Sequence, residues 1–191
     1  YKAALVRFAD QHADSVISSR ALHQLATVIQ AEGDFVKAHE IATTGMNRFP
    51  DSVGGRRCFN LIQSIKAWQI RAITERVWND PRPTIDVYYR NATKIYFRMV
   101  PYRFDDYIKS SRWNPEQLDG NARKDLLARK PVLAWSADLP ATEDYKERLE
   151  RIPSPDDLAS GSYYLIASHN KEFNVSDNQI SFCEVWESKL A

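Results

Sequence analysis

The strongest constraint on the fold of this chain is a change of hydrophobic period near residue 67. Before Ala67, apolar residues recur at helical spacing and a single proline occurs, Pro50. Beyond it, prolines recur, and β-branched or aromatic residues alternate with polar ones, which is the period of strands. The two periods predict an α+β chain with a helical part over residues 1–67 and a β part over residues 68–191.

Two amphipathic helices are predicted within the helical part, on either side of Gly33. Their apolar stripes are Leu22, Leu25, Ala26 and Ile29 in the first, and Phe35, Ala38, Ile41, Ala42 and Gly45 in the second. Small side chains in both stripes let two antiparallel helices approach closely, and Gly33 permits the tight turn between them. Residues 19–52 resemble a tetratricopeptide repeat, although Leu22 and Ile29 stand where large aromatic residues are usual.

The β part is expected to form a seven-stranded antiparallel sandwich. Alternation predicts strands at 68–76, 84–89, 94–101, 131–139, 146–152, 161–168 and 179–187. Residues 104–130 interrupt this pattern with helical spacing, so a helical insertion is predicted there. Its second helix is expected to begin at Asn114-Pro115-Glu116, because proline is favoured in the first turn.

Several segments of the β part are similar to the first macroglobulin domain of bacterial alpha-2-macroglobulin-like proteins. They are Tyr89–Val100, Trp135–Pro140 with Asp144-Tyr145, Ser160–Ser168 and Val185–Ala191. The resemblance covers roughly residues 56–191. It implies a fibronectin-III-like sandwich, and helical repeats precede this domain in large bacterial members.

The same resemblance implies a function and a location. Proteins of this family are secreted, often lipid-anchored in the periplasm or at the cell surface, and entrap proteases after cleavage of a bait region. The Cys-Gly-Glu-Gln thioester of covalent trapping is absent, since neither Cys58-Phe59-Asn60-Leu61 nor Cys183-Glu184-Val185-Trp186 matches it. We therefore expect a non-catalytic structural and interaction module of a protease-trapping inhibitor, whose partners are neighbouring domains and, through the full-length protein, proteases. The alternative is a scaffold or glycan-binding module of a bacterial cell-surface protein.

Composition argues against several other classes of function. Lys and Arg total 26 against 25 Asp and Glu, so the charge balance gives no reason to expect a nucleic-acid partner. No apolar run reaches the roughly 18 residues of a membrane span. The four histidines, His12, His23, His39 and His169, lack metal-ligand spacing, and no glycine-rich phosphate loop or nucleophile motif occurs. No enzyme activity, metal or cofactor is therefore expected.

The two cysteines, Cys58 and Cys183, fall in different predicted parts. An isolated, widely spaced pair favours two buried free thiols, because free cysteine behaves as a small hydrophobic residue. A disulfide between the two parts is the alternative, and it needs Cα atoms within about 7 Å.

The junction between the parts predicts a contact that involves Leu61, Ile62, Ile65 and Trp68. The first three form the apolar stripe of the last helix, and only Lys66 and Ala67 separate Ile65 from Trp68. Because no Gly-, Ser- or Pro-rich linker intervenes, we expect the two parts to behave as one rigid unit.

Aromatic residues are more numerous than a small sandwich core accommodates, with five Trp, nine Tyr and eight Phe. Six are predicted at the rim or outside the core: Trp78, Tyr88, Tyr96, Tyr102, Tyr107 and Trp186. They indicate either a contact surface with adjoining domains or a surface for a partner or glycan. Asn91 is expected in the turn between two strands, where asparagine tolerates left-handed backbone geometry.

Overall fold

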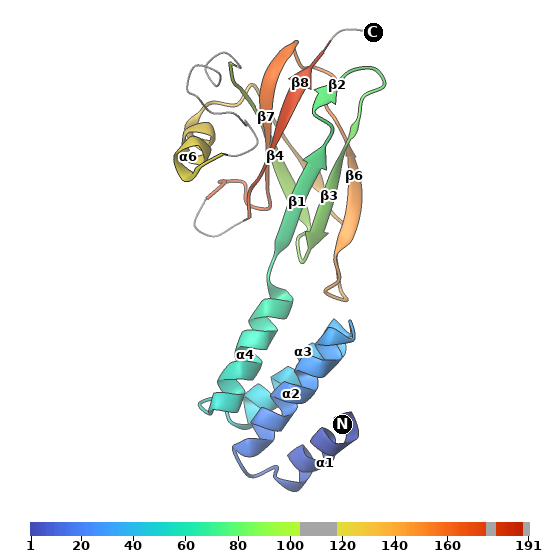
Figure 1. The fold of residues 1–191 in the computed structure, drawn as a ribbon, viewed down its shortest axis with the longest axis vertical. Helices are drawn as coiled ribbons and strands as arrows, with labels where there is room; N and C mark the ends of the chain where they lie inside the picture. The colour runs from blue at the N-terminus through green and yellow to red at the C-terminus, as the bar shows by residue number, and fades with distance from the viewer. Residues whose placement is uncertain (104–117, 175–178, 189–191) are drawn as a thin grey trace. The chain divides into compact units, whose positions relative to one another are not determined.

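The computed structural model describes residues 1–103, 118–174 and 179–188 of the chain (Figure 1). The chain forms two compact units. The first comprises Tyr1–Ala67 together with Thr142–Lys146, and the second comprises Trp68–Ala141 and Glu147–Ala191. The grouping of residues 142–146 with the helices was not predicted from the sequence. Among the described residues, no helix is both long and apolar enough to cross a membrane.

The first unit contains four helices: α1 (Lys2–Gln11), α2 (Ile17–Ala31), α3 (Phe35–Arg48) and α4 (Val53–Lys66). Helices α2 and α3 are the predicted pair, and Gly33 between them has a positive φ of 86°. Asp34 caps α3 by accepting a hydrogen bond from the Lys37 backbone N–H at 3.0 Å. Ser52 caps α4 in the same way through the Gly55 N–H, also at 3.0 Å.

Small residues allow the helices of the first unit to pack closely, as the sequence predicts. Ala26, Ala38 and Ala42 are completely buried. Gly54 of α4 was not among the predicted packing residues, yet it lies directly against the α2 backbone. A Cβ atom built on Gly54 would lie 2.5 Å from the Arg20 nitrogen and 2.7 Å from the Ser19 carbonyl carbon. Any side chain at this position would therefore push α4 away from α2.

We expect Gly54→Ala to destabilise the protein by about 1–3 kcal/mol, because overpacking against rigid backbone forces the helices to shift. Gly120→Ala is the matched control, since a Cβ atom there meets nothing within 4 Å. Its expected effect is neutral or slightly stabilising, because alanine is the better helix former. Urea unfolding followed by circular dichroism measures both, and equal stability of the two variants would contradict the close packing.

The described residues of the second unit form two sheets. The three-stranded sheet has the order β1-β3-β6, from β1 (Gln69–Thr74), β3 (Thr84–Arg90) and β6 (Arg148–Pro153). The five-stranded sheet has the order β2-β8-β7-β4-β5, from β2 (Val77–Trp78), β8 (Ser181–Glu187), β7 (Gly161–Ser168), β4 (Lys94–Pro101) and β5 (Leu133–Asp138). The seven longer strands fall within or overlap the seven predicted ranges.

The strand β2 is a departure from the sequence prediction. It pairs in parallel with β8, through Val77 with Trp186 and Trp78 with Glu187. The expectation of antiparallel pairing throughout is therefore wrong at this point. Two residues are too few for an alternating pattern to appear in the sequence, which is why the strand escaped prediction.

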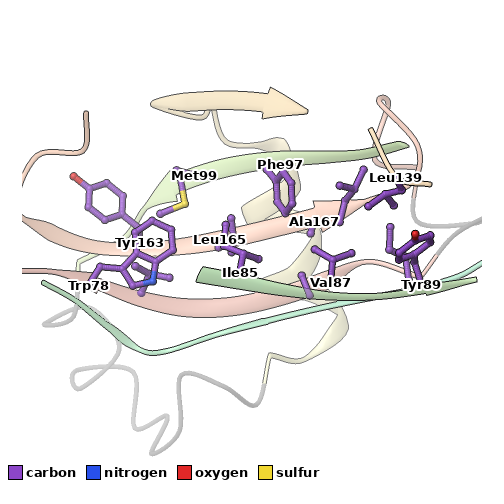
Figure 2. Packing of buried hydrophobic residues seen from close by; sticks show 14 of the residues in the cluster. Trp78, Ile85, Val87, Tyr89, Phe97, Met99, Leu139, Tyr163, Leu165 and Ala167 are labelled. Atoms are coloured by element: carbon purple, nitrogen blue, oxygen red, sulfur yellow. The ribbon is translucent and has the colours of Figure 1, made fainter. Parts of the chain in front are cut away.

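One hydrophobic core lies between the two sheets (Figure 2). Ile85 and Val87 of β3 contribute from the three-stranded sheet, while Phe97 of β4 and Leu165 of β7 contribute from the five-stranded sheet. Strand β3 alternates buried and partly buried residues along its length, which is the expected pattern for a strand with one covered face.

A second hydrophobic cluster covers the opposite face of the five-stranded sheet. Val100 of β4 and Tyr164 and Ile166 of β7 pack there against α6 (Gly120–Ala128) and Phe173. Helix α6 falls within the predicted insertion over 104–130. Residues 104–117, including the helix start predicted at 114–116, lie outside the described residues.

Candidate functional site

Two adjoining surface hollows of the second unit form the candidate site, called here the Tyr96 groove. The first has a volume of about 540 Å³ and is lined by residues that include Trp68, Asn91, Thr93, Lys94, Tyr96, His169, Asn170 and Lys171. The second, of about 500 Å³, shares Lys94, Tyr96 and Lys171 and adds Arg98, Ser136, Glu172 and Phe173, among others. Because three lining residues are common to both, the hollows form one elongated groove.

Strand β4 positions the floor of the groove. Lys94, Tyr96 and Arg98 alternate with the core residues Ile95, Phe97 and Met99, so they lie on the face that points away from the main core. Asn91, in the turn before β4, has a positive φ of 59°, which confirms the prediction for this residue.

The turn after β7 forms one wall of the groove and is held by its own hydrogen bonds. The Asn170 N–H donates to Ser168 Oγ at 2.9 Å, and Asn170 Oδ1 accepts from the Glu172 N–H at 2.9 Å. The Arg98 guanidinium donates to the Lys171 carbonyl at 3.3 Å and lies 4.0 Å from the centre of the Phe173 ring. This wall is therefore fixed to β4.

Trp68 and His169 form an aromatic pair at one end of the groove. Their ring centroids are 4.7 Å apart, and Trp68 is 57% exposed. Burial lowers the pKa of His169, which favours its neutral form. The lysine and arginine side chains that line the groove are Lys94, Arg98 and Lys171. Lys94 makes an ion pair of 3.2 Å with Asp138, whose side chain is 86% exposed.

A buried polar network occupies the far end of the five-stranded sheet. Glu184 of β8, with a side chain that is only 1% exposed, accepts hydrogen bonds from the Tyr102 hydroxyl and, at 3.0 Å, from Trp186 Nε1. Arg76 Nε lies 3.3 Å from the other carboxylate oxygen. Burial and the hydrogen bond to Glu184 raise the pKa of Tyr102 far above its usual range. The network joins β8 to residues distant in sequence and thus stabilises the sheet.

Tyr102→Phe removes the hydroxyl donor to a buried carboxylate, and we expect a loss of about 1–3 kcal/mol of stability at pH 7. The raised pKa gives this loss a pH dependence. Below pH ~10 the Tyr102 hydroxyl is protonated in both the folded and the unfolded protein, so its hydrogen bond to Glu184 stabilises the fold fully. Above that pH the unfolded phenol ionises first, so stability falls by up to about 1.4 kcal/mol per pH unit.

Urea unfolding between pH 7 and 11 therefore measures both the stability lost at pH 7 and the change of this loss with pH. The difference between the wild type and Tyr102→Phe is expected to shrink as the pH rises beyond 10. Tyr88→Phe serves as control, because the Tyr88 ring packs under Arg71 while its hydroxyl bonds to no other described residue. A difference that stays constant with pH would show that Tyr102 does not carry this linkage.

A second buried carboxylate, Glu187, anchors the end of β8. Arg82 donates to both of its oxygens, through Nη1 at 3.0 Å and Nη2 at 2.8 Å, and Arg82 Nε lies 3.4 Å from Asp156. The side chain of Glu187 is only 3% exposed. Bidentate pairing of this kind fixes the geometry of both partners, so it ties the segment after β2 to the last strand.

We expect Arg82→Met to cost about 3 kcal/mol, because it leaves the Glu187 carboxylate buried without its partner. The matched control is Arg151→Met. Arg151 Nε lies 3.6 Å from Asp86 in a pair whose side chains are 70% and 34% exposed, so its loss should cost less than about 1 kcal/mol. Thermal and urea unfolding compare the two, and equal losses would contradict the anchoring role of Arg82.

The residues predicted at the junction have distinct places within their own units. Ile65 packs in the cluster of Leu25, Ile29 and Ala38, and Ile62 packs in that of Ala26, Ala42 and Cys58. Leu61 is partly buried against both clusters. Trp68 belongs to the second unit and lines the Tyr96 groove. The predicted contact between the two parts stays a prediction.

The placement of several aromatic residues corrects the sequence analysis. Trp78 is completely buried in the main core, and Tyr102 is buried in the second cluster, so neither lies on an outer surface. Tyr88, Tyr96 and Trp186 are half-buried, while Tyr107 lies outside the described residues. Tyr102 is buried because the second cluster covers the other face of the sheet, whereas Trp78 is buried because β2 pairs with β8 and its indole enters the main core.

Both cysteines are free. Cys58 is completely buried, and burial raises the pKa of its thiol to about 11. Cys183 is only half-buried, and its thiol donates to the Ala72 carbonyl at 3.2 Å. No group of three or more His, Cys, Asp or Glu side chains able to hold a metal ion occurs in the described part of the chain.

The sequence pattern did not single out Lys171 and Arg98 of the groove. It also did not single out Arg82 and Glu187, the buried pair that anchors the end of β8. Charged residues in turns and strands resemble ordinary solvated positions in a sequence. The one available signal was Lys94-Ile95-Tyr96-Phe97-Arg98, in which polar, basic and aromatic residues alternate with core residues along one strand.

Comparisons of the chain with models of protein families, with curated proteins and with solved structures gave no match.

Proposed function

We propose that the chain is a non-catalytic structural and interaction module of a larger secreted protein of the bacterial alpha-2-macroglobulin-like type. In this proposal the first unit is a tetratricopeptide-like helical segment and the second is a fibronectin-III-like macroglobulin sandwich. The parent protein is secreted, held in the periplasm or at the cell surface, and entraps proteases.

Strand order is the observation that carries this proposal. Among the seven longer strands of the described residues, the first, second and fifth form one sheet, in the order β1-β3-β6. The seventh, sixth, third and fourth form the other, in the order β8-β7-β4-β5. Immunoglobulin-like sandwiches divide their strands between two sheets in the same manner, with the third, sixth and seventh strands of the fold together. Modules of this architecture commonly serve as extracellular building and binding domains.

The first unit supports the helical half of the proposal. The pair α2 and α3, joined by Gly33, is followed by α4, which packs on both. Pairs of antiparallel helices stacked through small residues are the unit of helical repeat proteins.

The environment of the buried ionisable groups supports a non-catalytic role. Catalytic groups need access to a substrate as well as an altered pKa. Tyr102 and Glu184 bond to each other inside the sheet, and the Cys58 thiol is completely buried among helices. Tyr102, Glu184 and Cys58 do not line the Tyr96 groove.

The test of this proposal compares the complete gene product with the 191-residue chain in a protease assay. Serine, cysteine, metallo- and aspartic proteases are incubated with each, and activity is then measured on a protein substrate and on a small peptide substrate. An entrapped protease is shielded from large substrates but still reached by small ones. We therefore expect the complete product to suppress cleavage of the protein substrate only, and the chain alone to change neither activity.

Two outcomes would overturn the proposal. Unchanged cleavage of the protein substrate by all four protease classes would contradict the trap. Inhibition by the chain alone would make it a direct inhibitor instead of a structural module.

A further inference from the structure

The Tyr96 groove combines an exposed indole, ammonium groups and side-chain amides within one elongated hollow. We propose that it binds an acidic polysaccharide, with a sugar ring against Trp68 and sugar carboxylates beside Lys94 and Lys171. This inference rests on the groove alone and goes beyond the protease-trap function proposed above.

Trp68 provides the stacking surface. A large aromatic side chain that is 57% exposed loses apolar area from water when a ligand covers it. The C–H face of a pyranose ring is flat and weakly positive, so it complements the negative face of an indole. His169 packs on Trp68 with ring centroids 4.7 Å apart and limits the orientations that the indole adopts. The ring is thus partly preorganised for a flat ligand.

Charge selects an acidic polymer over a neutral one. Among the described residues, Lys94, Arg98 and Lys171 line the groove together with one carboxylate, that of Glu172. Arg98 is engaged with the Phe173 ring and the Lys171 carbonyl, which leaves the two lysines to meet a ligand. The Lys94 partner, Asp138, is 86% exposed, and exposed ion pairs contribute little, so a ligand carboxylate can replace it.

The remaining lining groups suit sugar hydroxyls. Thr93, Asn170 and Ser136 supply hydroxyl and amide groups that donate and accept hydrogen bonds. Sites for small polar ligands commonly combine an apolar platform with a few such groups.

The backbone beneath the groove disfavours an acidic peptide as ligand. An extended peptide gains most of its affinity by adding a strand to a free sheet edge. Strand β4, the floor of the groove, is paired with β5 on one side and β7 on the other. A peptide in the groove would therefore lose hydration of its backbone without gaining ladder hydrogen bonds, whereas a sugar carries no such backbone.

Isothermal titration calorimetry of the whole chain tests the proposal with three probes. They are tetragalacturonate, the neutral tetrasaccharide cellotetraose, and a tetraglutamate peptide. We expect tetragalacturonate to bind most tightly and its affinity to fall when the salt concentration is raised, since exposed charges are screened.

Two variants locate the binding site. Trp68→Ala and Lys171→Ala should each weaken tetragalacturonate binding by about fivefold or more, and Trp68→Phe should restore part of the loss. Leu149→Ala and Lys124→Ala are the matched controls. Leu149 is an exposed apolar residue of β6, Lys124 is an exposed lysine of α6, and neither lines the groove. Circular dichroism of every variant verifies that the fold is retained.

Each unfavourable outcome is decisive. Absence of tetragalacturonate binding overturns the proposal, and so does equal binding of cellotetraose, because charge would then play no part. Tighter binding of tetraglutamate would identify an acidic peptide surface instead. Equal effects of the groove variants and the control variants would place any binding elsewhere. None of these results depends on whether the complete protein traps proteases.

Discussion

Strand β7 imposes the central constraint on the second unit, because both of its faces are buried. Its residues from Tyr163 to Ser168 are all buried. Tyr163, Leu165 and Ala167 belong to the main core, while Tyr164 and Ile166 belong to the second cluster on the other face. A strand of this kind is stable only if something besides the partner sheet covers it, and α6 with Phe173 provides that cover. The Tyr96 groove lies at the margin of this cover, where half-buried Tyr96 packs against the second cluster and also lines the hollow.

The two buried carboxylates of β8 lie on opposite faces of the sheet. Glu184 is opposite Tyr164 on the face of the second cluster, whereas Glu187 is opposite Gly161 on the face of the main core. Each is out of contact with water and needs a partner inside the protein. Glu184 obtains Tyr102, Trp186 and Arg76, and Glu187 obtains Arg82. Tyr102, Arg76 and Arg82 come from segments far earlier in the chain, whereas Trp186 belongs to β8 itself. The polar network therefore specifies how the last strand is placed, in addition to the apolar packing that drives its burial.

Local periodicity explains how much of the fold could be predicted from sequence. The pair α2 and α3, the seven longer strands and the turn at Asn91 each depend on residues close in sequence, and each was predicted. The parallel pairing of β2, the burial of Trp78 and the second cluster depend on contacts between distant segments. Trp78 illustrates the limit, because its neighbours Glu75, Arg76, Asn79 and Asp80 are polar and suggest an exposed loop. In the structure its indole fills the main core, and its Nε1 donates to Thr74 Oγ1 and to the Glu75 carbonyl, both at 3.1 Å.

The candidate site was harder to predict for a related reason. The groove lies where the residues of the second cluster stop covering the five-stranded sheet. The position of that boundary depends on several segments together, so no single segment of the sequence predicts it. Lys171 lines the groove because hydrogen bonds that involve Ser168, Asn170 and Arg98 fix the turn after β7. These bonds join the end of β7, the turn and the neighbouring strand β4.

The same hydrogen bonds make the wall of the groove rigid. They hold its wall on a strand that is paired on both sides, so a ligand meets a surface that needs little reorganisation, which lowers the entropic cost of binding. The groups whose pKa burial raises most, Tyr102 and Cys58, lie instead in buried clusters and do not line the groove.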